Sequence, residues 1–64
     1  MIPKDPAILL SFINTKLRDF YPSLDELCDD LQVEKDEIES ILMKINYKYS
    51  EKRNQFVWHK TRIM

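Results

Sequence analysis

Apolar side chains recur every three or four positions along the first two thirds of the chain, which is the spacing of amphipathic α-helices. Asp5 suits an N-cap, Pro6 suits the first helical position, and Pro22 disfavours helix in the residue before it. These signals predict a first helix from Asp5 or Pro6 to about Phe20 or Tyr21. The apolar stripe of this helix, which we expect to face the core, is Leu9, Leu10, Ile13, Leu17, Phe20 and Tyr21.

Two shorter amphipathic segments follow. The run from Ser23 to Glu26 has the pattern of a capping box, and it opens a helix that we expect to end near Leu31. A turn over residues 32–34 leads to a third helix, from about Lys35 to Ile45, which Asn46 can stop in the left-handed conformation. The apolar faces of the two helices are Leu24, Leu27, Cys28 and Leu31, and then Ile38, Ile41, Leu42 and Ile45.

The period changes after Asn46 from helical to alternating. Residues 47–49 read aromatic, polar, aromatic, and residues 56–58 are rich in strand formers, with a polar turn between the two runs. This pattern predicts a β-hairpin in which Tyr47 and Tyr49 share a face with Phe56 and Trp58. We therefore expect one domain over residues 1–58, followed by a loose, basic tail over residues 59–64.

The spacing of the second and third helices is typical of a helix-turn-helix, with Cys28 as the small residue at their close approach. The expected fold is mainly α: a three-helix, helix-turn-helix-like core followed by a C-terminal β-hairpin, as in winged-helix proteins. Gln32 stands where the tight turn commonly has glycine, and positive φ there would cost about 1 kcal/mol. The turn either accepts this cost or is rebuilt. Because the chain has no glycine, Asn46 and Asn54 are further candidates for positive φ.

Charge is distributed unevenly along the chain. Residues 23–39 hold eight acidic residues and one lysine, a net charge of −7, and this segment includes the first turns of the third helix. Acidic side chains there would repel phosphates, so this helix is disfavoured as a DNA reader. Residues 47–64 carry +4 and residues 1–46 carry −5. One end of the molecule therefore complements the other, which could promote head-to-tail self-association.

The basic side chains of the hairpin and tail have two interpretations. They could bind an acidic partner, including RNA or DNA, or they could only offset the acidic helices of the same fold. We favour the second interpretation and keep weak nucleic-acid binding as the alternative. The candidate contacts for that alternative are Lys48, Lys52, Arg53, Lys60 and Arg62.

Composition argues against most enzyme classes. A chain of 64 residues is too short to enclose a sizeable substrate cavity, and without glycine it cannot form the glycine-rich phosphate loops. The single cysteine, Cys28, excludes an intramolecular disulfide, and His59 has no neighbouring cysteine or histidine for a zinc site. No apolar run is long enough for a membrane span. We expect no catalytic residues, no cofactor, no metal and no membrane, and a cytoplasmic location.

Some residues lie off the predicted core stripes. Ile8, Phe12 and Met43 are candidates for an apolar interface with another protein or a second copy. The alternative is that the hairpin covers Ile8 and Phe12 and that Met43 is a single exposed residue. Asn14 and Arg18 lie one turn apart on the first helix. They either anchor the hairpin by hydrogen bonds, which we favour, or contact a partner.

Several runs together resemble a bacterial family, the domain of unknown function 4250. The matching runs are PAILLSFINTKLRD at 6–19, YPSLDELC at 21–28, YKY at 47–49 and NQF at 54–56. The resemblance covers about residues 2–57 and implies a bacterial, cytoplasmic setting without a known activity or site residues. The expected function is that of a protein-interaction or self-association module, with the partner unidentified.

Overall fold

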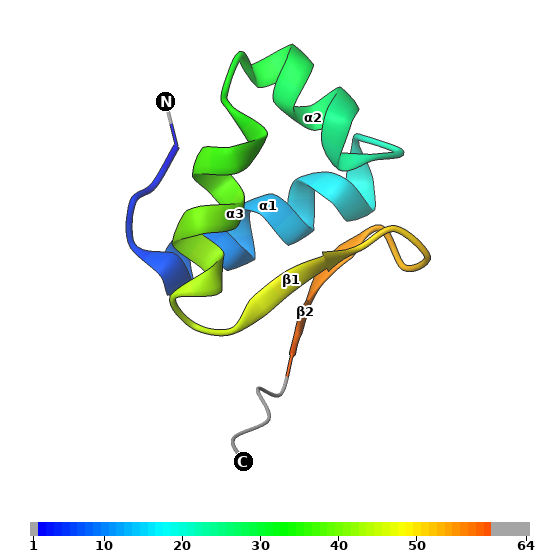
Figure 1. The fold of residues 1–64 in the computed structure, drawn as a ribbon. Coiled ribbons are helices and arrows are strands. Elements are labelled where there is room, and N and C mark those ends of the chain that lie inside the picture. The colour runs from blue at the N-terminus through cyan, green and yellow to red at the C-terminus, as the bar shows by residue number, and fades with distance from the viewer. Residues whose placement is uncertain (1, 60–64) are drawn as a thin grey trace.

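The fold consists of three helices followed by a two-stranded antiparallel hairpin, as the sequence predicts (Figure 1). The computed structural model describes residues 2–59. The elements are α1 (Pro6–Asp19), α2 (Leu24–Leu31), α3 (Lys35–Met43), β1 (Tyr47–Ser50) and β2 (Gln55–Trp58). No helix in this described part is long and apolar enough to cross a membrane.

Local capping explains where the first two helices begin. The Asp5 carboxylate accepts hydrogen bonds from the backbone N–H groups of Ala7 and Ile8, and Pro6 occupies the first turn of α1. The Ser23 hydroxyl accepts from the N–H of Glu26 and so caps α2. The predicted return bond from the Glu26 side chain does not form among the described residues, so only half of the capping box is present.

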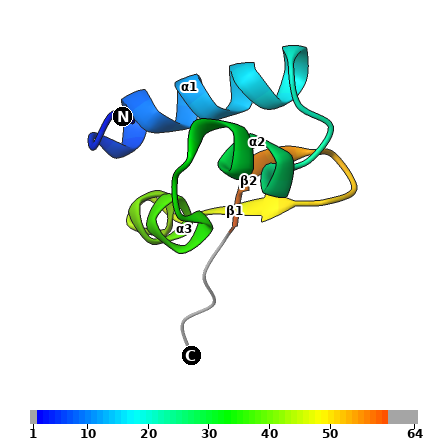
Figure 2. The ribbon, with the colours of Figure 1, turned by 90° about the horizontal axis from the view of Figure 1, so that it is seen from above.

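The core lies where α1, α2, α3 and the hairpin meet. α1 runs along one side, and α2, α3 and the hairpin pack against it (Figure 2). Two residues outside the predicted stripes, Ile2 and Phe56, join this core. Its buried members are Ile2, Leu9, Ile13, Leu17, Leu24, Leu27, Cys28, Ile38, Ile41, Leu42 and Phe56.

The prediction that Phe20 belongs to the core is wrong. Its side chain is 68% exposed, because Phe20 is the C-cap of α1, where the backbone leaves the helical conformation and turns the ring away from the stripe. The Lys16 ammonium nitrogen lies 4.9 Å from the centre of the Phe20 ring, so a cation–π contact covers part of it.

The turn between α2 and α3 contains the left-handed residue that is typical of a helix-turn-helix turn. Gln32 adopts the left-handed conformation, with φ 58° and ψ 47°, and the N–H of Val33 donates to the carbonyl of Cys28 at 3.1 Å. The chain therefore accepts the strain at Gln32 instead of rebuilding the turn. α3 ends at Met43, two residues before the predicted end at Ile45, because the last turn tightens into bonds between residues three apart, such as Ile45 N–H to Leu42 C=O.

Asn46 and Asn54 adopt positive φ, 63° and 54°, as predicted for a chain without glycine. Asn46 begins the hairpin and Asn54 closes its turn. Tyr47 pairs with Trp58 and Tyr49 with Phe56, so these four aromatic residues share one face of the hairpin as expected.

Candidate binding groove beside the hairpin

The hairpin is fixed to α1 through the side chain of Asn14. Its Nδ2 donates to the carbonyl of Phe56 at 3.0 Å, and its Oδ1 accepts from the N–H of Phe56 at 2.7 Å. The amide thus satisfies the outward N–H and C=O of Phe56 on the β2 edge as a neighbouring strand would. Gln55 Nε2 adds a bond to the carbonyl of Asn14 at 2.9 Å. The predicted role of Asn14 as a hairpin anchor is confirmed, whereas Arg18 instead forms an ion pair with Asp19.

A second set of hydrogen bonds holds the turn end of the hairpin. Tyr49 OH donates to Asn54 Oδ1 at 2.6 Å and accepts from the backbone N–H of Leu24 at 3.2 Å. Asn54 Nδ2 donates to the carbonyls of Leu17 and Tyr21, at 3.1 and 2.9 Å, where α1 ends. The hairpin is therefore tied to α1 and α2 through its turn and the adjoining residues of β2, and this part of β1 has a fixed position.

The outer edge of β1 is open. Phe56 directs its N–H and C=O toward Asn14, away from β1, so Phe56 and Tyr49 form a pair without mutual backbone bonds. Backbone groups alternate along a strand, so Tyr47 and Tyr49 both direct N–H and C=O away from β2. These four groups have no partner among residues 2–59. They are available to a further strand.

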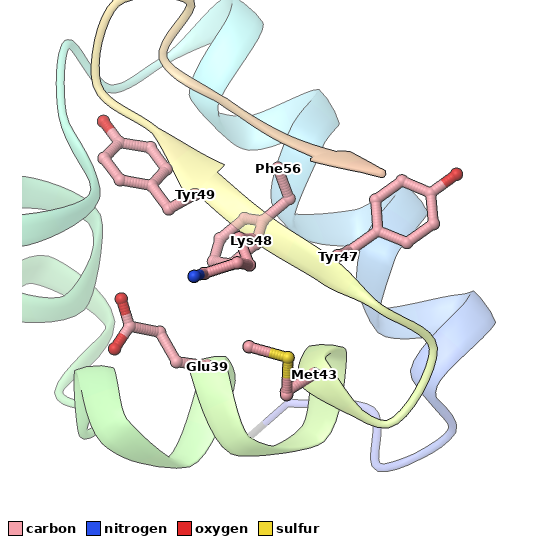
Figure 3. Close-up of a pocket in the computed structure, with 6 residues that line it drawn as sticks. All are labelled: Glu39, Met43, Tyr47, Lys48, Tyr49 and Phe56. Atoms are coloured by element: carbon pink, nitrogen blue, oxygen red, sulfur yellow. The ribbon is translucent and has the colours of Figure 1, made fainter. Parts of the chain in front are cut away.

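Two hollows follow this open edge, and we call them together the edge groove. The first has a volume of about 160 Å³ and is lined by Glu39, Met43, Tyr47, Lys48, Tyr49 and Phe56 (Figure 3). The second, about 170 Å³, is lined by Pro22, Ser23, Leu24, Asp25, Lys35, Tyr49 and Glu51. Tyr49 borders both. Residues from both faces of β1 line the first hollow, so it lies along the edge of the strand.

The wall opposite β1 is formed by α3. Figure 3 shows Glu39 and Met43 rising from α3 toward β1, with Lys48 extending from β1 over the gap. The Met43 side chain remains 46% exposed, which leaves an apolar surface in the groove without a covering partner among the described residues. The first hollow is thus mainly apolar, with one carboxylate and one ammonium at its rim.

The second hollow is polar, and part of its charge is already paired. Lys35 Nζ lies 3.0 Å from Asp25 Oδ1, and this hydrogen bond raises the pKa of Lys35. Glu51 lines the same hollow without a partner among residues 2–59. The groove therefore offers an apolar site at the Tyr47 end and an unpaired carboxylate at the Glu51 end.

The structure separates the three residues of the predicted apolar interface. Met43 lines the edge groove. Ile8 is 59% exposed on α1, and Phe12 is half-buried against the core, with the Lys16 ammonium 5.5 Å from its ring centre. An interface that uses all three stays a prediction.

The candidate nucleic-acid contacts are also spread out. Lys48 lines the edge groove, and Lys52 and Arg53 are exposed in the turn of the hairpin. Lys60 and Arg62 lie outside the described residues. The described part of the chain thus brings no more than three of these five cations onto the hairpin.

Cys28 and His59 are the remaining candidates for chemistry in the described part of the chain. Cys28 is buried, as predicted, and burial raises the pKa of its thiol, with a further contribution from nearby Asp25. No group of three histidine, cysteine, aspartate or glutamate side chains that could hold a metal ion occurs within residues 2–59. The His59 N–H donates to the carbonyl of Asn46 at 2.6 Å and extends the strand pairing.

Sequence reasoning missed the edge groove. The hairpin itself was predicted, and a two-stranded sheet necessarily has two edges, so an open edge could have been expected. The predicted anchoring role of Asn14 does not specify a strand, so it does not show that Asn14 bonds to β2, 42 positions away, and leaves the β1 edge open.

Comparison with known proteins identifies a family without an assigned activity. The family model described as a domain of unknown function (DUF4250) matches residues 3–56, which is most of the chain. No curated protein and no solved structure matches the chain. The match agrees with the resemblance found in the sequence.

Proposed function

Because the chain belongs to the DUF4250 family, whose description assigns no activity, we propose its function from its surface: a protein-interaction module that binds an extended peptide segment in the edge groove. The observation that carries this proposal is the open edge of β1 beside an apolar hollow. A bound segment would pair with the free backbone groups of Tyr47 and Tyr49 and place side chains against Met43.

The anchoring of the hairpin supports this mode of binding. Strand addition needs an edge that is already extended and held in place, since ordering a loose strand would reduce the affinity. Here Asn14 and the Tyr49–Asn54 hydrogen bonds hold the hairpin before any partner arrives. Main-chain pairing would then supply affinity, and the two hollows would select side chains at alternate positions.

The charge of α3 favours a protein partner over nucleic acid. Asp36 and Glu37 are exposed in the first turn of α3, where a recognition helix would approach phosphates. The hairpin offers few cations to compensate for this repulsion. Weak nucleic-acid binding through Lys48, Lys52 and Arg53 has no comparable supporting contact.

Amide exchange can test the proposal. Peptides enriched from a random displayed library would be titrated into the ¹⁵N-labelled protein. Without peptide, the amides of Tyr47 and Tyr49 should exchange fast and that of Lys48, which pairs with Val57, slowly. Bound peptide should slow exchange at Tyr47 and Tyr49 and leave Lys48 nearly unchanged.

Two arginine substitutions locate the site. Met43→Arg, which places a charge in the apolar hollow, should weaken peptide binding about tenfold or more. Ile8→Arg makes a similar change on exposed α1 and should leave binding intact. Failure to enrich any peptide would contradict the proposal, and so would binding that is lost with Ile8→Arg and kept with Met43→Arg.

A further inference from the structure

We infer that the segment bound in the edge groove is residues 60–64 of a second copy of this chain, added antiparallel to β1. This inference rests on the proposed peptide-binding function and names its partner. Residues 60–64 read Lys-Thr-Arg-Ile-Met, with basic or apolar side chains at alternate positions. These residues lie outside the described part of the chain, and their order in the sequence is what matches the groove.

The open backbone groups limit the register, and the side chains that line the groove select one of the allowed registers. An antiparallel strand must place its own bonding residues opposite Tyr49 and Tyr47, two positions apart. Setting Arg62 opposite Tyr49 places Met64 opposite Tyr47, beside exposed Met43 in the apolar hollow. The same register places Lys60 opposite Glu51 at the other end of the groove.

In this register, the basic side chains of residues 60–64 would meet complementary groups of the groove. Lys60 meets the unpaired carboxylate of Glu51, and the guanidinium of Arg62 meets the Tyr49 ring on the side of Glu39. Lys48 of β1 would lie opposite Ile63, so it would not meet a second cation. Moving the register by one residue would turn the basic side chains to the opposite face, away from these partners.

A second copy must supply the strand. Glu51 lies at the turn end of the hairpin, whereas His59, the residue before Lys60 in the sequence, lies at the opposite end and bonds to Asn46. Consecutive Cα atoms are about 3.8 Å apart, whereas the four residues of β1 span roughly 13 Å, so Lys60 cannot reach Glu51 of its own chain. The acidic α2–α3 side of one copy and the basic end of the next attract each other at longer range.

Light scattering and sedimentation of the full chain over a wide concentration range would test the inference. The mass of the wild-type protein should rise with concentration to at least that of a dimer, whereas a variant lacking residues 60–64 should stay monomeric. Lys60→Glu and Glu51→Lys should each weaken association about tenfold, and the double variant should recover most of the loss. Glu37→Lys, with the same charge change on α3 outside the groove, should weaken association far less than Glu51→Lys does, because it reduces only the long-range attraction.

Several results would overturn the inference. They are a wild-type protein that stays monomeric throughout, association that survives deletion of residues 60–64, and a charge swap that restores nothing. If library peptides nevertheless bind the edge groove, the interaction function stands and only the self-partner is wrong. If an isolated peptide of residues 59–64 binds no better than its scrambled sequence, the register is refuted as well.

Discussion

Asn14 shows how one side chain can replace a strand. Its amide presents a donor and an acceptor at the spacing of a peptide group, and both bond to Phe56 at the β2 edge. Without that side chain, the backbone N–H and C=O of Phe56 would need water as a partner, although Phe56 is only 2% exposed. The position of the hairpin, and so of the edge groove, depends on this residue.

Replacing Asn14 with alanine should therefore destabilise the protein. Both backbone bonds are lost in a partly buried place, which should lower the free energy of unfolding by about 2 kcal/mol. Urea denaturation followed by Trp58 fluorescence would measure the change. Thr15→Ala, an exposed neighbour on α1, is the matched control and should change stability by less than about 0.5 kcal/mol. Equal losses for the two variants would show that the Asn14 bonds do not anchor the hairpin.

The buried thiol of Cys28 leads to a second prediction for a single residue, which concerns how stability depends on pH. Burial raises the pKa of its thiol, so the folded state keeps the thiol proton to higher pH than the unfolded state does. The stability linked to this thiol is therefore complete below its ordinary pKa of 9.0 and is lost as pH rises through the raised pKa.

We expect the unfolding free energy of the wild type to fall more steeply above that pH than that of Cys28→Ala. Denaturation curves of both proteins across this pH range would measure it, and comparison with the variant removes the contribution of Tyr21, whose pKa is also raised, mainly by its bond to Asp30. Disulfide exchange with an aromatic thiol reagent should also be slow in the folded wild type. If the unfolding free energies of the two proteins fell in parallel with pH, the prediction that the Cys28 thiol has a raised pKa would be contradicted.

At the scale of elements, three connections each contain a non-glycine residue with positive φ. Gln32 joins α2 to α3, Asn46 leads into β1, and Asn54 closes the hairpin. Asparagine tolerates this conformation better than glutamine does, so the strain is greatest at Gln32. The side chains also differ, because Asn54 bonds to α1, at Leu17, whereas Gln32 is exposed and its side chain makes no hydrogen bond among the described residues.

Glycine substitutions at these positions should have opposite effects. Gln32→Gly removes the strain without losing a contact and should stabilise the protein by up to about 1 kcal/mol. Asn54→Gly also relaxes the backbone but loses the bonds to Leu17, Tyr21 and Tyr49, so it should destabilise by about 2 kcal/mol. Thermal unfolding of both variants would measure this difference. Stabilisation in both cases would mean that the Asn54 bonds contribute little.

The same elements show what local sequence can and cannot predict. Helix starts at Pro6 and Leu24 follow from caps within three residues, and the positive φ of Asn46 and Asn54 follows from residue type. Phe20 was misplaced because periodicity does not show where a helix unwinds into its C-cap. The groove depends on contacts between residues such as Asn54 and Leu17, 37 positions apart, and no local pattern records these.

At the scale of the whole molecule, fold and charge favour different partners. Gln32 has the left-handed conformation typical of a helix-turn-helix turn, and α3 follows α2 in the order of a recognition helix. The acidic side chains of α2 and α3 make that surface repulsive to phosphates. If only the negative charge of α3 prevents DNA binding, the protein should bind DNA once this charge is reversed.

The double substitution Asp36→Lys and Glu37→Lys should therefore create DNA binding. It changes the charge of the first turn of α3 by +4 at two exposed positions without touching the core. We expect no binding of mixed-sequence duplex DNA by the wild type at low salt, and binding by the variant that weakens steeply as salt is added, since cations released from DNA drive it. Fluorescence anisotropy of a labelled duplex would measure both proteins. The matched variant Lys52→Glu and Arg53→Glu should bind no DNA, and wild-type binding that this variant abolishes would instead favour the basic hairpin as a nucleic-acid site.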